Sequence, residues 1–189
     1  MKKFAFITTM IALGMTSCVQ SPEDKANKLI EAYIKSSLKN PETYEFVETK
    51  IDSAFTPYCD PAFHEDLTYL IRYTADLTNL ENEIINEQAS ADKNSAKIDE
   101  LSEQTKLIQE KGSKTIEKIR TALASKPTFI GYKTVHQYRA KNTSGEVFNG
   151  EQLLIIDKDF TKIELAYDMD SDAYRLVKEM ITKLKEGID

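Results

Sequence analysis

The sequence predicts an α+β fold, in which a small antiparallel β-sheet is flanked by N- and C-terminal helices and a long helical hairpin is inserted after the first strand. Three observations lead to this fold. Apolar residues recur at helical spacing near both ends, four shorter segments have strand patterns, and residues 62–111 contain neither Gly nor Pro. The chain has 189 residues, 41% hydrophobic and 30% charged, which suits one soluble-type domain and excludes disorder or a multispan membrane protein.

The first helix is predicted to begin after Ser21, because Ser is a favoured N-cap and Pro22 a favoured first helical residue. Asn40-Pro41 ends this helix, and a strand is expected from about residue 44 to 54. The apolar stripe of the helix consists of Ala26, Leu29, Ile30, Tyr33, Ile34 and Leu38.

Residues 62–125 are predicted to form two long, coiled-coil-like helices, because apolar or small residues recur every seven positions. An interleaved apolar series fails at Glu87 and Asn94, where the chain has little to bury. We interpret this gap as the bend of an antiparallel hairpin with arms of roughly 62–88 and 95–125. One uninterrupted helix that pairs in a parallel dimer is the alternative. The seven-residue series is Leu70, Leu77, Ile84, Ala91, Ile98, Thr105, Gly112 and Ile119.

Three strands and a final helix are expected after the hairpin. Residues 128–141 alternate between two faces, and a turn is predicted at residues 142–145. The run from Leu153 to Ile156 is apolar on both faces, which predicts a central strand with Leu154 and Ile155 both buried. A strand over 162–167 and a helix after Asp172 complete the domain.

The N-terminal segment has the features of a bacterial export signal. Two lysines precede an apolar run of about twelve residues, which is too short to span a bilayer as a mature helix. Met15-Thr16-Ser17-Cys18 resembles the lipobox of bacterial lipoproteins, although that family usually has Leu in place of Met15 and Gly or Ala in place of Ser17. The resemblance implies cleavage of residues 1–17, acylation of Cys18, a tether over 18–24 and one domain over 25–189. The alternative is an ordinary secretory peptide with an incidental Cys.

Two further patterns are similar to lipoproteins of Bacteroidota-type bacteria. The acidic residues soon after Cys18 resemble their surface-export signal, and the segments 38–44 and 136–145 resemble blocks in small uncharacterised members. These resemblances imply no activity. They imply a membrane-anchored protein of the cell envelope, in the outer membrane and on its periplasmic face or at the cell surface.

The sequence favours a non-catalytic protein without a cofactor. A formal net charge of −6 argues against nucleic acid as a partner. The P-loop, GxGxxG, GxSxG and HExxH motifs are absent from the sequence. Besides Cys18, the only thiol and imidazoles belong to Cys59, His64 and His136. Asp60 follows Cys59 and disfavours the thiolate that nucleophilic catalysis needs.

A calcium loop is the weaker interpretation of an acidic segment near the C-terminus, and we predict no metal site. The spacing of Asp168, Asp170, Asp172 and Glu179 matches oxygen ligands of such a loop. Ala173 stands where the sharp turn of that loop needs Gly. Acidic residues at a helix N-terminus are also expected from the helix dipole alone.

Two functions remain open. The first is a lipid-anchored interaction or structural module whose helical hairpin meets another protein of the envelope. The second is binding of a small ligand, such as a carboxylate or a sugar, at a strand end that carries Tyr138, Arg139, Lys141 and Asn142. Against the second function, Arg139 and Lys141 also fit a solvated basic face that pairs with Glu42, Glu45 or Glu146.

The first prediction concerns the anchor. Changing Cys18→Ala removes the only side chain that the lipobox resemblance assigns to acylation. We expect metabolic labelling with palmitate to be lost and uncleaved or mislocalised precursor to accumulate. Labelling that survives the substitution would contradict the assignment.

Overall fold

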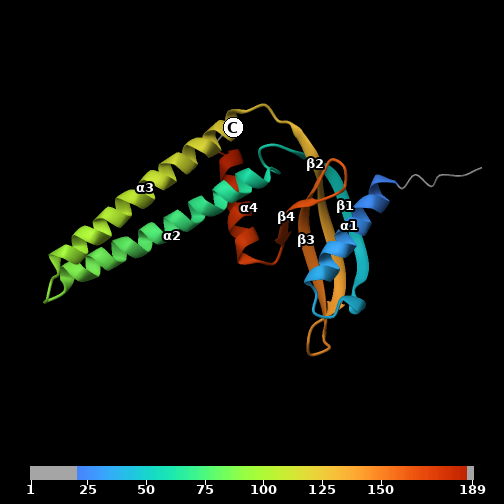
Figure 1. Cartoon of the computed structure of the whole chain (residues 1–189), viewed down its shortest axis with the longest axis horizontal. Coiled ribbons are helices and arrows are strands. Elements are labelled where there is room, and N and C mark those ends of the chain that lie inside the picture. The colour runs from blue at the N-terminus through green and yellow to red at the C-terminus, as the bar shows by residue number, and fades with distance from the viewer. Residues whose placement is uncertain (1–20, 187–189) are drawn as a thin grey trace, which may run out of the picture.

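The structure is a computed structural model that describes residues 21–186, so Cys18, the signal segment 1–17 and the first part of the tether lie outside the described residues. It confirms an α+β fold with four α-helices and one four-stranded antiparallel sheet in the order β1-β2-β3-β4 (Figure 1). A short 3₁₀ helix, which the sequence did not indicate, precedes β1. The elements are α1 (Pro22–Ser37), η1 (Pro41–Thr43), β1 (Glu45–Phe55), α2 (Pro61–Ala89), α3 (Ser95–Ala124), β2 (Phe129–Lys141), β3 (Val147–Asp157), β4 (Ile163–Asp168) and α4 (Asp172–Glu186).

The strand β3 is longer than predicted. The sequence indicated only residues 153–156, the run that is apolar on both faces. In the structure Asn149 and Gly150 pair with Arg139 and Tyr138 of β2. A Cβ atom at position 150 would lie 2.3 Å from the ring of Tyr138. Gly150 is therefore a strand residue whose missing side chain leaves space for an aromatic ring.

Helix α1 covers one face of the sheet. Ser21 caps it as predicted: its hydroxyl accepts a hydrogen bond from the Asp24 amide at 3.1 Å, and the Asp24 carboxylate accepts one from the Ser21 amide at 3.2 Å. The tether predicted over 18–24 thus includes the first residues of α1. The core under the helix contains Ala26, Ile30, Ile34, Tyr138, Ala140, Leu154 and Ile156. Burying each large apolar side chain contributes about 1.5–3 kcal/mol.

Helix α4 and the base of the long helices form a second core. Phe63 and Leu67 of α2, Ile119 of α3 and Val177 of α4 are buried together and pack against Tyr167 of β4. Leu154 and Ile155 are 0% and 2% exposed, although neighbouring residues of a strand point to opposite faces. The predicted burial on both faces is confirmed.

Helices α2 and α3 lie side by side and form an arm that extends beyond the two cores (Figure 1). At 1.5 Å per residue each helix is about 45 Å long. Ion pairs join them near the turn, Glu87 to Lys97 at 3.0 Å, and near the base, Asp66 to Lys118 at 3.5 Å. Both pairs join residues equally distant from the turn, as antiparallel helices require. The chain thus turns back on itself instead of continuing as one helix.

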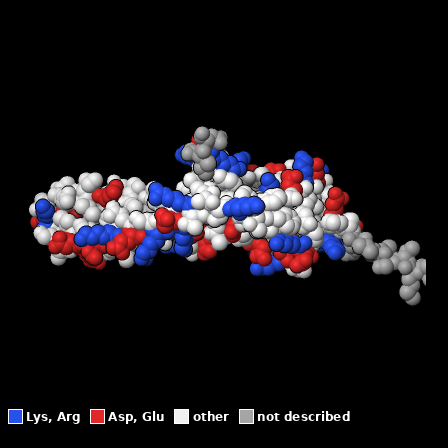
Figure 2. Space-filling view, turned by 90° about the horizontal axis from the view of Figure 1, so that it is seen from above, with Lys and Arg blue, Asp and Glu red and all other residues white. Residues whose placement is uncertain are grey.

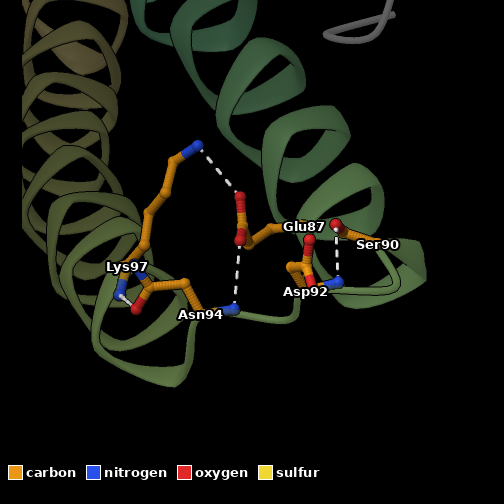
Figure 3. A network of polar contacts seen from close by, with 5 residues as sticks. All are labelled: Glu87, Ser90, Asp92, Asn94 and Lys97. Atoms are coloured by element: carbon orange, nitrogen blue, oxygen red, sulfur yellow. Dashed lines mark hydrogen bonds and ion pairs between the residues drawn. The ribbon is translucent and has the colours of Figure 1, made fainter.

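The turn at the tip of the arm is closed by polar contacts (Figure 3). The Glu87 carboxylate accepts hydrogen bonds from the Asn94 amide and the Lys97 ammonium, at 3.1 and 3.0 Å. The Asn94 side chain caps α3 by accepting from the Lys97 amide. The hydrogen bonds from Lys97 and Asn94 lower the pKa of Glu87. Glu87 and Asn94 are the two positions where the interleaved apolar series fails, so the interruption in the pattern marks the turn.

The second prediction tests the register of the arm. Residues equally distant from the turn should face each other, which brings Leu77 near Ile108. In a background with Cys59→Ala and without Cys18, Leu77→Cys with Ile108→Cys should close an intramolecular disulfide at low protein concentration, because the bond needs Cα atoms within about 7 Å. Non-reducing electrophoresis measures the closure. Covalent dimers from Leu77→Cys alone, with no closure in the double variant, would instead indicate parallel pairing of two chains.

Candidate functional site

One long face of the arm carries an apolar groove between α2 and α3. The hollow has a volume of about 430 Å³. Gly112 lies in its floor, and a Cβ atom added there would meet nothing within 4 Å. The groove face, as we call this surface, is lined by Leu70, Tyr73, Thr74, Leu77, Gln109, Gly112, Ser113 and Ile116, none of which is charged.

The opposite face of the arm is charged. A smaller hollow there, of about 270 Å³, includes Asp76 and Glu83 together with Gln104. On helical geometry Lys97 and Lys118, which form the two ion pairs between the helices, fall on this side of α3. Figure 2 shows charged side chains gathered along one long edge of the arm, beside a largely uncharged surface. The two faces of the arm therefore differ in their chemistry.

The contact between α2 and α3 leaves much of the arm's apolar surface in water. Beyond the base of the arm, Leu80 and Leu101 are buried, while Leu77, Ile84, Ile98 and Ile108 are only partly buried. Ile85 and Leu107 are 60% and 53% exposed. A two-helix seam is a narrow hydrophobic contact, and covering it with a further helix would bury more of this surface.

A second, polar hollow lies on the face of the sheet opposite α1. Strand β4 pairs only with Gln152 to Ile156, so the first half of β3 extends past it. The hollow has a volume of about 390 Å³. We call it the sheet hollow. Its lining consists of Val47, Gln137, Tyr138, Arg139, Asn149, Gly150, Glu151 and Asp170. Within it, the Arg139 Nε donates to the Asn149 side-chain oxygen Oδ1 at 3.2 Å, and the Gln137 side-chain amide donates to the Glu151 carboxylate at 2.9 Å.

Of the four residues predicted to bind a ligand, the structure brings Tyr138 and Arg139 to the sheet hollow and places Lys141 and Asn142 outside its lining. Arg139 is exposed and lines the sheet hollow. Tyr138 is only 6% exposed and packs beneath α1, so its ring belongs to the core. Asn142 shapes the β2–β3 turn, where its side-chain oxygen accepts from the amides of Ser144 and Glu146. Lys141 is exposed but does not line the hollow.

The sequence analysis missed the partners of Arg139 in the sheet hollow. Asn149 and Glu151 were not recognised as strand residues, and Val47 belongs to an irregularity in β1 where the pairing register shifts. The turn predicted at residues 142–145 contained only a partial signal. Counting outward from it sets Arg139 opposite Phe148, one residue short of the observed register, in which Lys141 pairs with Val147 and Arg139 with Asn149.

The acidic residues considered for calcium contact separate partners in the structure. Asp168 accepts from the amide of Asp170, Asp172 pairs with Arg175, and Glu179 pairs with Lys183. Within residues 21–186 no group of three or more His, Cys, Asp or Glu side chains is arranged to hold a metal ion.

The imidazoles have partners other than Cys59. His64 contacts the Tyr58 carbonyl oxygen at 2.8 Å and the Tyr167 hydroxyl at 3.3 Å. His136 contacts the hydroxyls of Tyr44 and Thr49 at 3.1 and 2.9 Å. Both histidines are buried, and burial lowers the pKa of each, for His136 to about 4. Neither geometry is that of a Cys–His nucleophile pair.

Comparisons with protein-family models, curated proteins and solved structures gave no match. In the part of the chain that the structure describes, no helix combines the length and apolarity needed to cross a membrane.

The third prediction concerns pH. His136 has a folded-state pKa near 4, below the ordinary value of 6.5, so folding is favoured while the imidazole is neutral. This contribution to the free energy of unfolding is fully present above pH 6.5. It is lost as the pH falls toward 4, and the total loss is roughly 3 kcal/mol. Urea unfolding should show the loss, and it should shrink in His136→Gln. Ring C–H resonances in NMR should titrate near pH 4 for His136, whereas a midpoint at 6.5 or above would contradict the prediction.

Proposed function

We propose that this chain is a lipid-anchored protein of the bacterial cell envelope that binds another envelope protein through its arm and has no catalytic role. The observation that supports it best is the difference between the two faces of the arm. Ion pairs join the helices on one side, and the groove face on the other side is uncharged and incompletely buried. Large exposed apolar surfaces on a soluble body are typical of interaction sites.

The position of the arm suits an anchored protein. The first turn of α1 and the turn between α2 and α3 lie at opposite ends of the molecule (Figure 1). An acylated Cys18 would precede Ser21 by three residues, a span of about 10 Å at most. The body would then sit close to the bilayer with the tip of the arm directed away from it, where a second envelope protein could reach it.

The partner that fits the groove face best is an amphipathic helix. Gly112, Ser113 and Thr74 have small side chains, which permit close approach of a third helix. Such a helix would cover Leu77 and Ile116, which the two-helix arm leaves incompletely buried. The groove lining itself contains no Lys or Arg, and charges of both signs border it on α3, where Lys106, Glu110 and Lys114 lie beside Gln109 and Ser113.

The fourth prediction tests this binding with a matched pair of variants. Gln109 and Gln104 are both exposed residues of α3, but Gln109 lines the groove face and Gln104 lies on the charged face. Gln109→Glu places a charge where an apolar helix would dock and should weaken capture of the partner about tenfold, equivalent to about 1.4 kcal/mol. Gln104→Glu makes the same chemical change and should leave capture unchanged.

Capture is measured by cross-linking in intact cells, followed by purification of the full chain and quantification of the co-purified protein. Deletion of residues 62–125 should abolish it. Equal capture by both Gln→Glu variants, or capture that survives the deletion, would contradict the proposal. A cross-linked product that contains only this chain would identify a second copy as the occupant of the groove. That outcome would contradict binding of a different envelope protein.

A further inference from the structure

The sheet hollow contains charges of both signs that have no ion-pair partner. Arg139, Glu151 and Asp170 all line it. Among residues 21–186, ten ion pairs join Lys or Arg to Asp or Glu, yet none of them includes these three residues. A hollow in which unpaired positive and negative groups converge is complementary to a ligand that carries both charges.

Hydrogen bonds within the hollow hold Arg139 and Glu151 in place. Arg139 uses its Nε to donate to the Asn149 oxygen, which leaves its terminal nitrogens to bind a carboxylate in the bidentate manner typical of guanidinium groups. Gln137 donates to one oxygen of Glu151, so the other oxygen remains an acceptor. Asp170 comes from the loop after β4 and adds a second carboxylate to the lining. Carboxylates of this kind accept hydrogen bonds from an ammonium group.

The size of the hollow limits the ligand. Its volume of about 390 Å³ lies at the lower end of the range for small-molecule sites, about 300–1,000 Å³. Val47 is the one aliphatic side chain in the lining and offers an apolar contact. The paired backbones of β2 and β3 form the floor of the hollow.

We propose that the sheet hollow binds a small zwitterionic ligand of the amino-acid or dipeptide class. Arg139 binds its carboxylate, Glu151 and Asp170 bind its ammonium group, and Val47 contacts its side chain. This site does not involve the arm, so it goes beyond the proposed partner binding, and either proposal can fail without the other.

The fifth prediction tests the proposal with the dipeptide Ala-Leu as the probe. Amide resonances of the full chain in detergent are followed by NMR during titration with Ala-Leu, N-acetyl-Ala-Leu or Ala-Leu amide. We expect saturable shifts at Val47, Arg139, Glu151 and Asp170 with Ala-Leu. Blocking either terminus should weaken binding about tenfold, since each block removes one charged contact.

Variants assign the roles of the individual charges. Arg139→Gln should weaken Ala-Leu about tenfold without weakening Ala-Leu amide, and Asp170→Asn should affect Ala-Leu but not the N-acetyl form. Lys141→Gln is the matched control for Arg139, because Lys141 lies two residues along the same strand but outside the hollow, and it should bind like the unchanged chain. No saturation with Ala-Leu, equal binding of the blocked forms, or an equal loss in Lys141→Gln would overturn the proposal.

Discussion

The junction where β1 leaves the sheet and β2 returns to it determines the rest of the architecture. Phe55 pairs with Phe129, and their rings meet edge to face. One residue farther along, the amide of Thr56 donates to the Thr128 carbonyl, and the amide of Thr128 donates to the Thr56 hydroxyl. Because both ends of the long insertion are held at one point, α2 and α3 must run antiparallel. Closing so long a connection costs entropy, which the contacts at its base and along the arm offset.

The sheet is covered on both faces, but unequally. Helix α1 covers the face that carries Leu154, while α4 and the base of the arm cover the face that carries Ile155. Strand β4 ends opposite Gln152, and beyond that point the residues that line the hollow on the second face come from strands and from the loop after β4. The sheet hollow results from this difference in strand length. The polar residues that line it are therefore compatible with a stable fold, because the apolar cores lie elsewhere in the sheet.

The arm and the sheet hollow are separate surfaces with different chemistry. The groove face is uncharged, long and only partly buried, which suits an extended helix. The sheet hollow is small and lined by unpaired charges, which suits a compact ligand. The two proposals share one physical feature. Each surface lacks a kind of contact that its ligand would supply. For the groove face that contact is apolar burial, and for the sheet hollow it is charge pairing.

The sequence alone was sufficient for features that depend on neighbouring residues. The N-cap at Ser21, the turn near Glu87 and Asn94, and the two-sided burial of Leu154 and Ile155 follow from caps and periodicity, which act over a few residues. The sheet hollow depended on tertiary structure, because Val47, Arg139, Glu151 and Asp170 come from four separate segments. Their approach requires the register of β2 with β3 and the early end of β4. Adjacent residues of a strand face opposite sides of the sheet, so Tyr138 and Arg139 lie on different faces. Helix α1 packs on the face of Tyr138, which makes Tyr138 a core residue and leaves Arg139 exposed.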